Sequence, residues 1–142
     1  HCIPYLQKGK NPHIITLSPP INLNPKWLGG HIAYTTTKYS MSLLALGWAA
    51  EFKDQIASNA LWPKTTIDTA AVRNLLGGEA LAKMSRTPEI LADAVYYIMR
   101  KPVSQCSGNT FVDEEVFAAE GITNLDQYAV VPGGPLYPDL FV

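Results

Sequence analysis

Hydrophobic positions along the chain gather into short, nearly unbroken runs separated by longer segments with helical spacing. Three such runs, residues 13–17, 56–62 and 110–112, predict strands. The first run is β-branched and shows little polar alternation, which is typical of a strand covered on both faces in a parallel sheet. Ser18-Pro19-Pro20 and Pro63 end the first two runs, because proline cannot donate to a strand ladder.

The longest segment with helical spacing covers residues 34–53. At the rise of an α-helix this segment is about 30 Å long, enough to cross a sheet. Met41, Leu44, Ala45 and Trp48 fall on one stripe of this helix. The stripe is broad enough to serve the sheet on one side and a second copy of the chain on the other, so it predicts core packing or self-association.

A second helix has a clear start signal in the sequence. Thr87 predicts its N-cap, Pro88 its first position, and Glu89 a charge that complements the helix dipole, while Pro102 ends it. Its apolar face consists of Ile90, Leu91, Ala94, Val95, Ile98 and Met99. The remaining predictions are the end of a helix in residues 1–10, a loop at 21–31, two short helices around Gly77-Gly78 within 69–84, a short helix at 114–120, and an extended tail without regular structure at 132–138.

Strands that alternate with helices at this spacing predict right-handed crossovers and a parallel sheet. We therefore predict an α/β fold, a partial doubly wound (Rossmann-like) sheet with flanking helices. The 142 residues suffice for one domain. Within it we expect residues 1–113 to form the core and residues 114–142 a C-terminal extension.

Composition and charge exclude several classes of function. Hydrophobic residues make up 47% and charged residues 16% of the chain, as in folded globular proteins. The net charge of -1 and the absence of a basic run argue against a nucleic-acid partner, and no apolar stretch is long enough to span a membrane. Cys2 and Cys106 form no metal pattern and no disulfide framework, so we expect no metal site.

The first residue is histidine, and no signal-peptide pattern follows it. We expect the chain to be a piece that begins in mid-structure. We also expect the protein to be not secreted, and to reside in the cytoplasm or in an organelle lumen of reducing character.

Three side chains that can move or hold a proton fall near the predicted carboxyl ends of strands, where open α/β sheets bind ligands. Ser18 ends the first strand, and Tyr34 and Lys38 lie one helical turn apart, on one face. An ammonium group near a phenol favours the phenolate, so we expect Lys38 to lower the pKa of Tyr34 toward working pH. Such a group suits the interconversion of an alcohol and a ketone.

The same pattern has a plainer interpretation, a tyrosine and a lysine on a solvated helix face. Tyr97 and Lys101 repeat the spacing at the end of another helix, beside Pro102. His13 and His31 have no partners at ligand spacing, so we expect them to be structural or exposed.

The order of motifs nevertheless resembles that of one family, the short-chain dehydrogenases/reductases, over residues 1–113, the second, catalytic half of that fold. The matching stretches are Ile14-Ile15-Thr16-Leu17-Ser18, Ala33-Tyr34-Thr35-Thr36-Thr37-Lys38, Asn59-Ala60-Leu61-Trp62-Pro63, Thr87-Pro88-Glu89-Ile90-Leu91-Ala92 and Ser107-Gly108-Asn109-Thr110-Phe111-Val112-Asp113. Ser18-Pro19-Pro20, the stretch from Asn59 to Thr65, and Pro132-Gly133-Gly134-Pro135-Leu136 are similar to its hydroxysteroid-dehydrogenase-like branch in particular.

The resemblance implies an oxidoreductase that uses NAD or NADP to interconvert a secondary alcohol and a ketone. Tyr34 would be the catalytic acid/base, Lys38 would lower its pKa and bind the nicotinamide ribose, and Ser18 would orient the substrate carbonyl. The residues implied in cofactor binding are Tyr34, Lys38, Pro63, Lys64, Ile67 and Thr69. The resemblance also implies a homodimer or homotetramer built through the helix at 34–53, and the apolar residues 69–84 resemble a mobile substrate loop, which favours a small, lipid-like substrate.

The chain also departs from the family pattern. Ser18 lies further before Tyr34 than is usual, Asp113 is followed by glutamates instead of glycines, and Lys64 stands where most members have glycine. Lys64 would either crowd the nicotinamide pocket or reach a cofactor phosphate. No glycine-rich phosphate-binding turn is present, so we expect the N-terminal half of the fold to be absent, one sheet edge to be exposed, and the 142 residues alone to be inactive. The alternatives are a non-catalytic α/β binding or assembly module and an inactive fragment.

Overall fold

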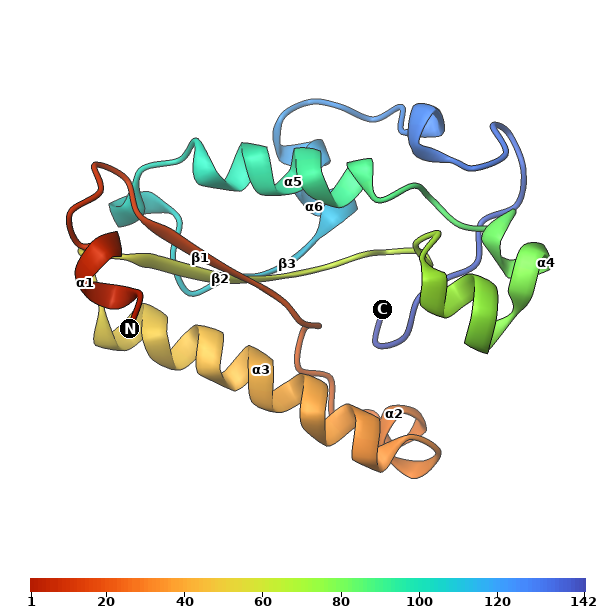
Figure 1. Ribbon diagram of the computed structural model, residues 1–142, viewed down its shortest axis with the longest axis horizontal. Helices are drawn as coiled ribbons and strands as arrows, with labels where there is room; N and C mark the ends of the chain where they lie inside the picture. Colours follow the sequence, from red (N-terminus) through yellow and green to blue (C-terminus); the bar gives the residue numbers. More distant parts are fainter.

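Three parallel strands form the middle layer of the computed structural model, which describes residues 1–142 (Figure 1). The strands are β1 (His13–Leu17), β2 (Ala57–Trp62) and β3 (Thr110–Val112), in that order across the sheet. His13 pairs with Ala57 and Ala60 with Thr110, and both ladders are parallel. All three strands and their parallel arrangement confirm the prediction.

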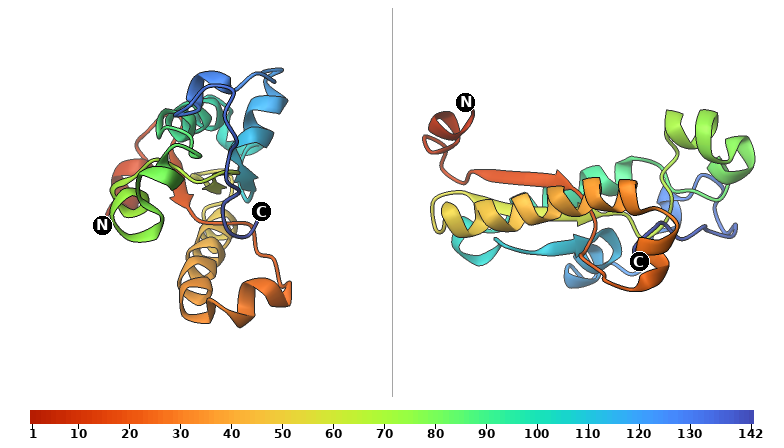
Figure 2. Two further views of the ribbon diagram at one scale, coloured as in Figure 1. Left: turned by 90° about the vertical axis from the view of Figure 1, so that its right-hand side faces the viewer. Right: turned by 90° about the horizontal axis from the view of Figure 1, so that it is seen from below.

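Helices cover both faces of this sheet (Figures 1 and 2). They are α1 (Ile3–Leu6), α2 (Pro25–Gly29), α3 (Ile32–Glu51), α4 (Gly78–Ala82), α5 (Glu89–Met99) and α6 (Asp113–Ala119), together with a π-helical turn η1 (Val72–Leu76) and the 3₁₀ turns η2 (Val103–Gln105) and η3 (Asp126–Tyr128). Helix α3 lies along one face, and α5 and α6 lie on the other. The chain is therefore a partial, doubly wound, Rossmann-like α/β fold, as predicted.

The face of α3 that meets the sheet differs from the predicted apolar stripe. Its buried residues are Thr35, Tyr39, Ser42 and Ala45. Of the predicted stripe only Ala45 is buried, and Leu44 is exposed. Small and hydroxyl side chains let the helix lie close to the strands, and the Ser42 hydroxyl donates a 2.6 Å hydrogen bond to the carbonyl of Pro19.

Two local predictions were wrong in detail. The expected loop at 21–31 contains α2, whose N-cap Asn24 accepts a hydrogen bond from the main chain of Lys26. Asparagine before Pro25 is a helix-start signal, so the sequence did carry this information. Helix α5 begins at Glu89 with Pro88 as its N-cap, one position later than Thr87 predicted.

The glycine pair 77–78 separates η1 from α4, as predicted. A Cβ on Gly77 would lie 2.5 Å from the Cβ of Leu81, and Gly78 has a φ of +62°, a conformation that favours glycine. Any other residue at Gly77 would push the first turn of α4 away from η1.

The hydrophobic core is not confined to residues 1–113. Its larger cluster joins α5 and β2 to Val116, Phe117 and Tyr128, which follow that boundary. A smaller cluster consists of Tyr39, Trp62 and Phe141. We call residues 137–142 the C-terminal strap, and Figure 1 shows the chain ending beside the sheet, close to α3.

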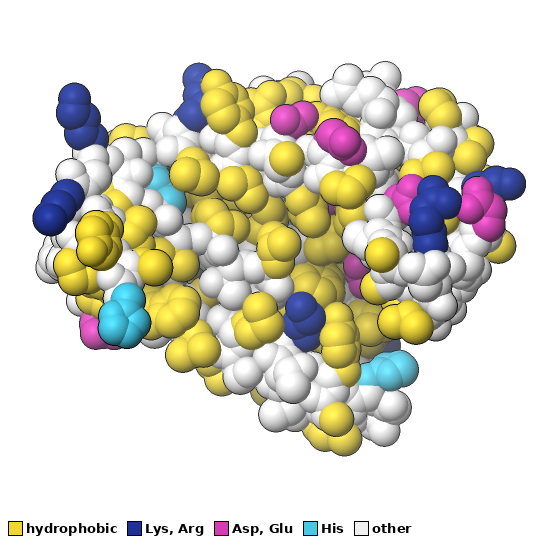
Figure 3. Space-filling model, viewed as in Figure 1, with side chains coloured by type: hydrophobic (Ala, Val, Ile, Leu, Met, Phe, Trp, Pro, Cys, Tyr) yellow, Lys and Arg dark blue, Asp and Glu magenta, His cyan; other side chains and the backbone are white.

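The outer edge of β1 is unpaired, because β1 forms a ladder with β2 alone. In Figure 3, which looks onto this edge, hydrophobic side chains gather across the middle of the face, between α5 and α3. Leu17 at the end of β1 is half exposed. An open edge with an apolar surround is where a doubly wound sheet adds further strands.

The strap gives a first testable prediction. Phe141 is 3% exposed, so Phe141→Ala should lower the free energy of unfolding by about 3 kcal/mol or more, the usual cost of removing a buried phenyl ring. Urea denaturation measures this cost. Tyr137 lies on the same strap but is exposed, so the control Tyr137→Ala should cost less than about 0.5 kcal/mol. Equal costs for the two variants would show that the strap is not part of the folded core.

Candidate active site

A pocket of about 320 Å³ lies at the carboxyl ends of β1 and β2. Five of the predicted site residues line it: Tyr34, Lys38, Pro63, Ile67 and Thr69. The other lining residues are Leu17, Trp62, Thr66, Ala71, Val72, Leu76, Leu91 and Asp139. The lining comes from both strands, α3, the loop after β2, η1, α5 and the C-terminal strap, so the fold assembles this site from segments far apart in the sequence.

Tyr34 and Lys38 lie on adjacent turns of α3 and face the same pocket. The Lys38 Nζ is 5.9 Å from the centroid of the Tyr34 ring and 5.2 Å from that of the Trp62 ring. An ammonium group at this distance from an aromatic face is attracted to its negative charge density. Trp62, the last residue of β2, therefore helps to keep the lysine beside the tyrosine.

The electrostatic surroundings of Tyr34 differ from the sequence-based expectation. Burial and the nearby Asp139 carboxylate raise the pKa of the Tyr34 hydroxyl, whereas Lys38 was expected to lower it. No local pattern in the sequence indicates that Asp139, more than a hundred residues later, lines the same pocket as Tyr34. The hydroxyl is consequently a proton donor at neutral pH in this structure.

Ser18 follows β1 directly and is fully buried. Its main-chain N–H donates to the carbonyls of Thr16 and Leu61, while its Oγ has no hydrogen-bond partner. Ser18 does not line the pocket that holds Tyr34. A buried hydroxyl without a partner is costly, and in this structure the Ser18 Oγ is such a group, buried outside the lining of the pocket.

Lys64 lies in the loop after β2, is exposed, and does not line the pocket. Its main chain, by contrast, is held firmly. The Lys64 N–H donates a 2.9 Å hydrogen bond to the Asp113 Oδ1, and its carbonyl accepts one from the Asp139 N–H. Asp113 also accepts from the N–H of Glu114, at 2.7 Å.

Asp113 thereby connects the ends of β2 and β3. Burial raises the pKa of this carboxyl, while its hydrogen bonds to Lys64 and Glu114 and the nearby Arg86 act to lower it. Asp113, at the end of the last strand, thus fixes the loop that carries Pro63, because it binds the main chain of Lys64 in that loop. Its structural role was not foreseen from the sequence.

The second tyrosine–lysine pair is structural. Tyr97 packs against Phe117 in the core, with ring centroids 5.6 Å apart. The Lys101 Nζ lies 3.4 Å from a carboxylate oxygen of Glu120, and its carbonyl is 3.1 Å from the Nε2 of His13. This pair provides an internal control for the pair at Tyr34.

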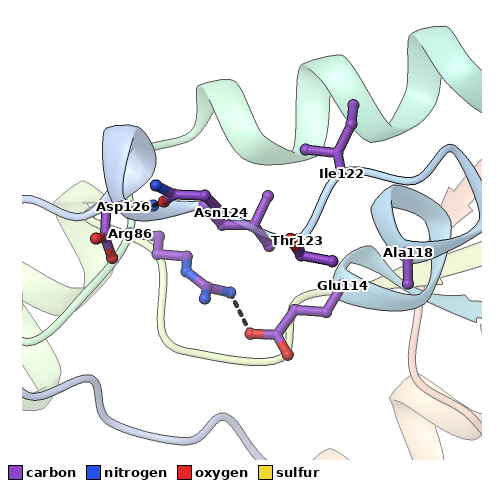
Figure 4. Close-up of a pocket in the computed structure, with 8 residues that line it drawn as sticks. Arg86, Glu114, Ala118, Ile122, Thr123, Asn124 and Asp126 are labelled. Carbon is purple, nitrogen blue, oxygen red and sulfur yellow. Dashed lines mark hydrogen bonds and ion pairs between the residues drawn. The ribbon is translucent and has the colours of Figure 1, made fainter.

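Figure 4 shows a second pocket, of about 550 Å³, which shares no lining residue with the pocket of Tyr34 and Lys38. The Arg86 and Glu114 side chains point toward one another in it, with Nη1 and Oε1 2.6 Å apart. The rest of its lining is Ala118, Ile122, Thr123, Asn124, Leu125 and Asp126. None of the predicted site residues lines this pocket, and its ion pair joins α6 to the segment before α5.

Two further features bear on the class of protein. The structure holds no group of three or more histidine, cysteine or acidic side chains placed to bind a metal. None of its helices combines the length and the apolar character that a membrane crossing requires.

Comparisons with known proteins bear on the family of this chain. No family model matches the chain. Over 141 residues it is 56% identical to hydroxysteroid dehydrogenase-like protein 2 of Xenopus tropicalis and 53% identical to the human protein of that name. These matches cover 99% of this chain and 33% of each relative, so the chain spans about a third of their length.

Two solved structures are similar over 99% of this chain. A short-chain dehydrogenase from Mycobacterium thermoresistibile has a TM-score of 0.88 and 52% identity, with half of its own chain covered. A putative dehydrogenase from Xanthomonas campestris has a TM-score of 0.90 and 48% identity, with 52% of its chain covered.

The fold, the pocket and these similarities together define the class. The chain belongs to the short-chain dehydrogenase/reductase family. Within that family it is a member of the hydroxysteroid-dehydrogenase-like branch.

Asp113 gives the second prediction. Asp113→Ala removes the acceptor of two main-chain N–H groups and should lower the free energy of unfolding by about 2 kcal/mol, because unsatisfied donors are costly. Urea denaturation is the measurement. Asp126 is exposed and its side chain accepts no hydrogen bond in the structure, so Asp126→Ala should change stability by less than about 0.5 kcal/mol. A neutral effect at Asp113 would contradict its role in joining the strand ends.

Proposed function

We propose that the protein carrying this chain is an NAD(P)-dependent oxidoreductase that interconverts a secondary alcohol and a ketone, with Tyr34 as the acid/base. The observation that supports this most directly is the shared pocket of Tyr34 and Lys38 at the carboxyl ends of β1 and β2. Ligands of open α/β sheets bind at this edge. Tyr97 and Lys101 have the same spacing but do not line this pocket. Their position therefore favours Tyr34 over Tyr97 as the acid/base.

The residues of this pocket suit the nicotinamide end of a dinucleotide. Lys38 and Thr69 offer donors to ribose and carboxamide oxygens, while Pro63 and Ile67 offer an apolar wall for a ring. Neither Gly29-Gly30 nor Gly77-Gly78 lies between a strand and a helix, so these glycines are not placed to hold the diphosphate. The choice between NAD and NADP falls to residues that this chain does not supply.

The proposed roles follow from the chemistry of each group. A bound nicotinamide supplies or accepts the hydride at the substrate carbon. In ketone reduction the Tyr34 hydroxyl donates its proton to the substrate oxygen, and in alcohol oxidation the phenolate accepts that proton. The Lys38 ammonium stabilises the phenolate. Orientation of the substrate carbonyl by Ser18 stays a prediction, because its Oγ is unpartnered but buried outside the pocket lining.

The remaining pocket wall favours an apolar substrate. Val72 and Leu76 of η1 and Leu91 of α5 all line the pocket. The turn at Gly77-Gly78, where Gly78 has a positive φ, separates η1, which lines the pocket, from α4. We therefore propose a small, lipid-like ketone or secondary alcohol as the substrate class.

We also propose that the protein is a homodimer or homotetramer that associates through α3. Leu43 and Leu44 are exposed on this helix and, with Trp48, line a shallow apolar hollow on its outer side. The sheet-facing side of α3 is occupied by other residues, so this hollow is free to meet a second copy.

Replacement of the tyrosine tests the proposed chemistry. In a full-length protein that carries this chain, Tyr34→Phe should lower kcat between about 100-fold and 10,000-fold, because the proton donor is lost. Binding of NAD(P)H, followed by nucleotide fluorescence, should change little. The matched control is Tyr97→Phe, which alters the other tyrosine–lysine pair and should retain turnover. Retained activity in Tyr34→Phe would remove Tyr34 from the mechanism.

Replacement of the lysine tests the cofactor-binding part of the proposal. Lys38→Met removes the ammonium from the pocket and should lower kcat/KM by about 100-fold or more while weakening NAD(P)H binding. Lys64→Met removes a charge that lies outside the pocket, so turnover and nucleotide affinity should stay near the wild-type values. If Lys64→Met instead weakens nucleotide binding as strongly, Lys64 reaches a cofactor phosphate.

A further inference from the structure

Main-chain hydrogen bonds bind the C-terminal strap to the loop after β2, which lines the pocket. The Tyr137 carbonyl accepts from the Thr66 N–H, at 2.9 Å, and the Asp139 N–H donates to the Lys64 carbonyl, at 3.1 Å. The Trp62 Nε1 donates to the Leu140 carbonyl, at 2.9 Å. These bonds fix the strap to β2 and to the loop that follows it.

Phe141 anchors the end of the strap among aromatic rings. Its ring is stacked on that of Tyr34, with centroids 6.2 Å apart and planes inclined by 15°. It also lies 5.2 to 6.0 Å from the rings of Trp27, Tyr39 and Trp62. Phe141 has a φ of +73°, a conformation that a bulky residue adopts only where its surroundings hold it.

The anchored strap places Asp139 in the wall of the pocket with Tyr34 and Lys38. These three are the only titratable side chains that line it, since the strands, η1, α5 and the loop after β2 contribute none. The Asp139 Oδ1 accepts a 2.6 Å hydrogen bond from the Leu140 N–H, which orients the carboxylate. Burial raises the pKa of the Asp139 carboxyl, while the Leu140 N–H and the Lys38 ammonium act in the opposite direction and favour the ionised form.

We propose that Asp139 is a positioning residue of this site, carried to the pocket by the C-terminal strap, and that its carboxylate keeps the Tyr34 hydroxyl in its protonated form. The inference rests on the proposed function, because it concerns the residue assigned there as the acid/base. Lys38 alone would favour the phenolate. The carboxylate offsets this influence, so that Tyr34 remains a proton donor as the pH rises.

The sign of the effect follows from the charge. Burial raises the pKa of Tyr34 most, and the Asp139 carboxylate raises it further. Reduction of a ketone needs the protonated hydroxyl. Reduction should therefore decline only above that raised pKa. Without the charge, the decline moves to lower pH. In the oxidation direction the phenolate is required, so the rise in rate also moves to lower pH.

The test uses the full-length protein with tyrosine labelled with ¹³C at Cζ, and follows the titration of Tyr34 by NMR. Absence of its resonance from Tyr34→Phe assigns the signal. Asp139→Asn keeps the acceptor for the Leu140 N–H but removes the charge, and should shift the Tyr34 titration to lower pH. Asp139→Glu should restore the wild-type titration. Asp139→Ser is a second neutral variant, for use if the asparagine variant does not fold.

The matched control is Asp126→Asn, which removes a carboxylate that lies outside this pocket and should leave the Tyr34 titration unchanged. A titration in the neutral Asp139 variants that superimposes on the wild type overturns the inference. So does an equal shift in Asp126→Asn, because the effect would then reflect net charge alone.

The pH dependence of kcat/KM for ketone reduction is a second readout. Its alkaline decline should move to lower pH in Asp139→Asn and return in Asp139→Glu. Failure of the proposed function has a different signature, namely turnover that survives Tyr34→Phe. The NMR titration decides the role of Asp139 in either case, because it requires no catalysis.

Discussion

β2 is buried on both faces and paired with a strand on each edge. The helix, the loop and the strap that line the pocket all pack against it or follow it. All six of its residues are buried. Most polar groups in such a strand find an internal hydrogen-bond partner, although the Ser58 Oγ of β2 does not. Asn59 finds such partners: its amide donates to the Cys106 carbonyl, and its Oδ1 accepts from both the main chain and the side chain of Asn109. These bonds lock the entry to β3 against β2 and so fix where both strands end.

The residues at the strand ends in turn position the groups that line the pocket at this edge of the sheet. Trp62 closes β2 with its ring near the Lys38 ammonium and its indole N–H on the Leu140 carbonyl. Asp113, at the end of β3, holds the main chain of Lys64. One strand therefore supports the helix that carries Tyr34, the loop that carries Pro63 and lines the pocket, and the strap that completes the pocket.

The sequence predicted those parts that depend on local pattern. Short apolar runs predicted the strands, and helical spacing of apolar residues predicted α3. The glycine pair 77–78 predicted the turn that divides residues 69–84. Tyr34, Lys38, Pro63, Ile67 and Thr69 meet in one pocket because parallel strands end at a common edge.

What the sequence did not reveal depends on contacts between distant segments. The helix face of α3 could not be assigned from periodicity, because Thr35 and Ser42 are polar yet buried, while Leu44 is apolar yet exposed. Burial and, after it, the Asp139 carboxylate raise the pKa of Tyr34. No local pattern in the sequence shows that Tyr34 becomes buried or that this carboxylate returns to the pocket.

The strap has a consequence for the order in which the molecule is built. Its contacts with Trp62 and Tyr34 join residues about eighty to more than a hundred positions apart, so they raise the contact order of this region. During synthesis from the N-terminus, α3 and β2 leave the ribosome well before Phe141 does. The pocket therefore stays open on that side until translation has passed the strap, and the aromatic cluster closes around Phe141 only afterwards.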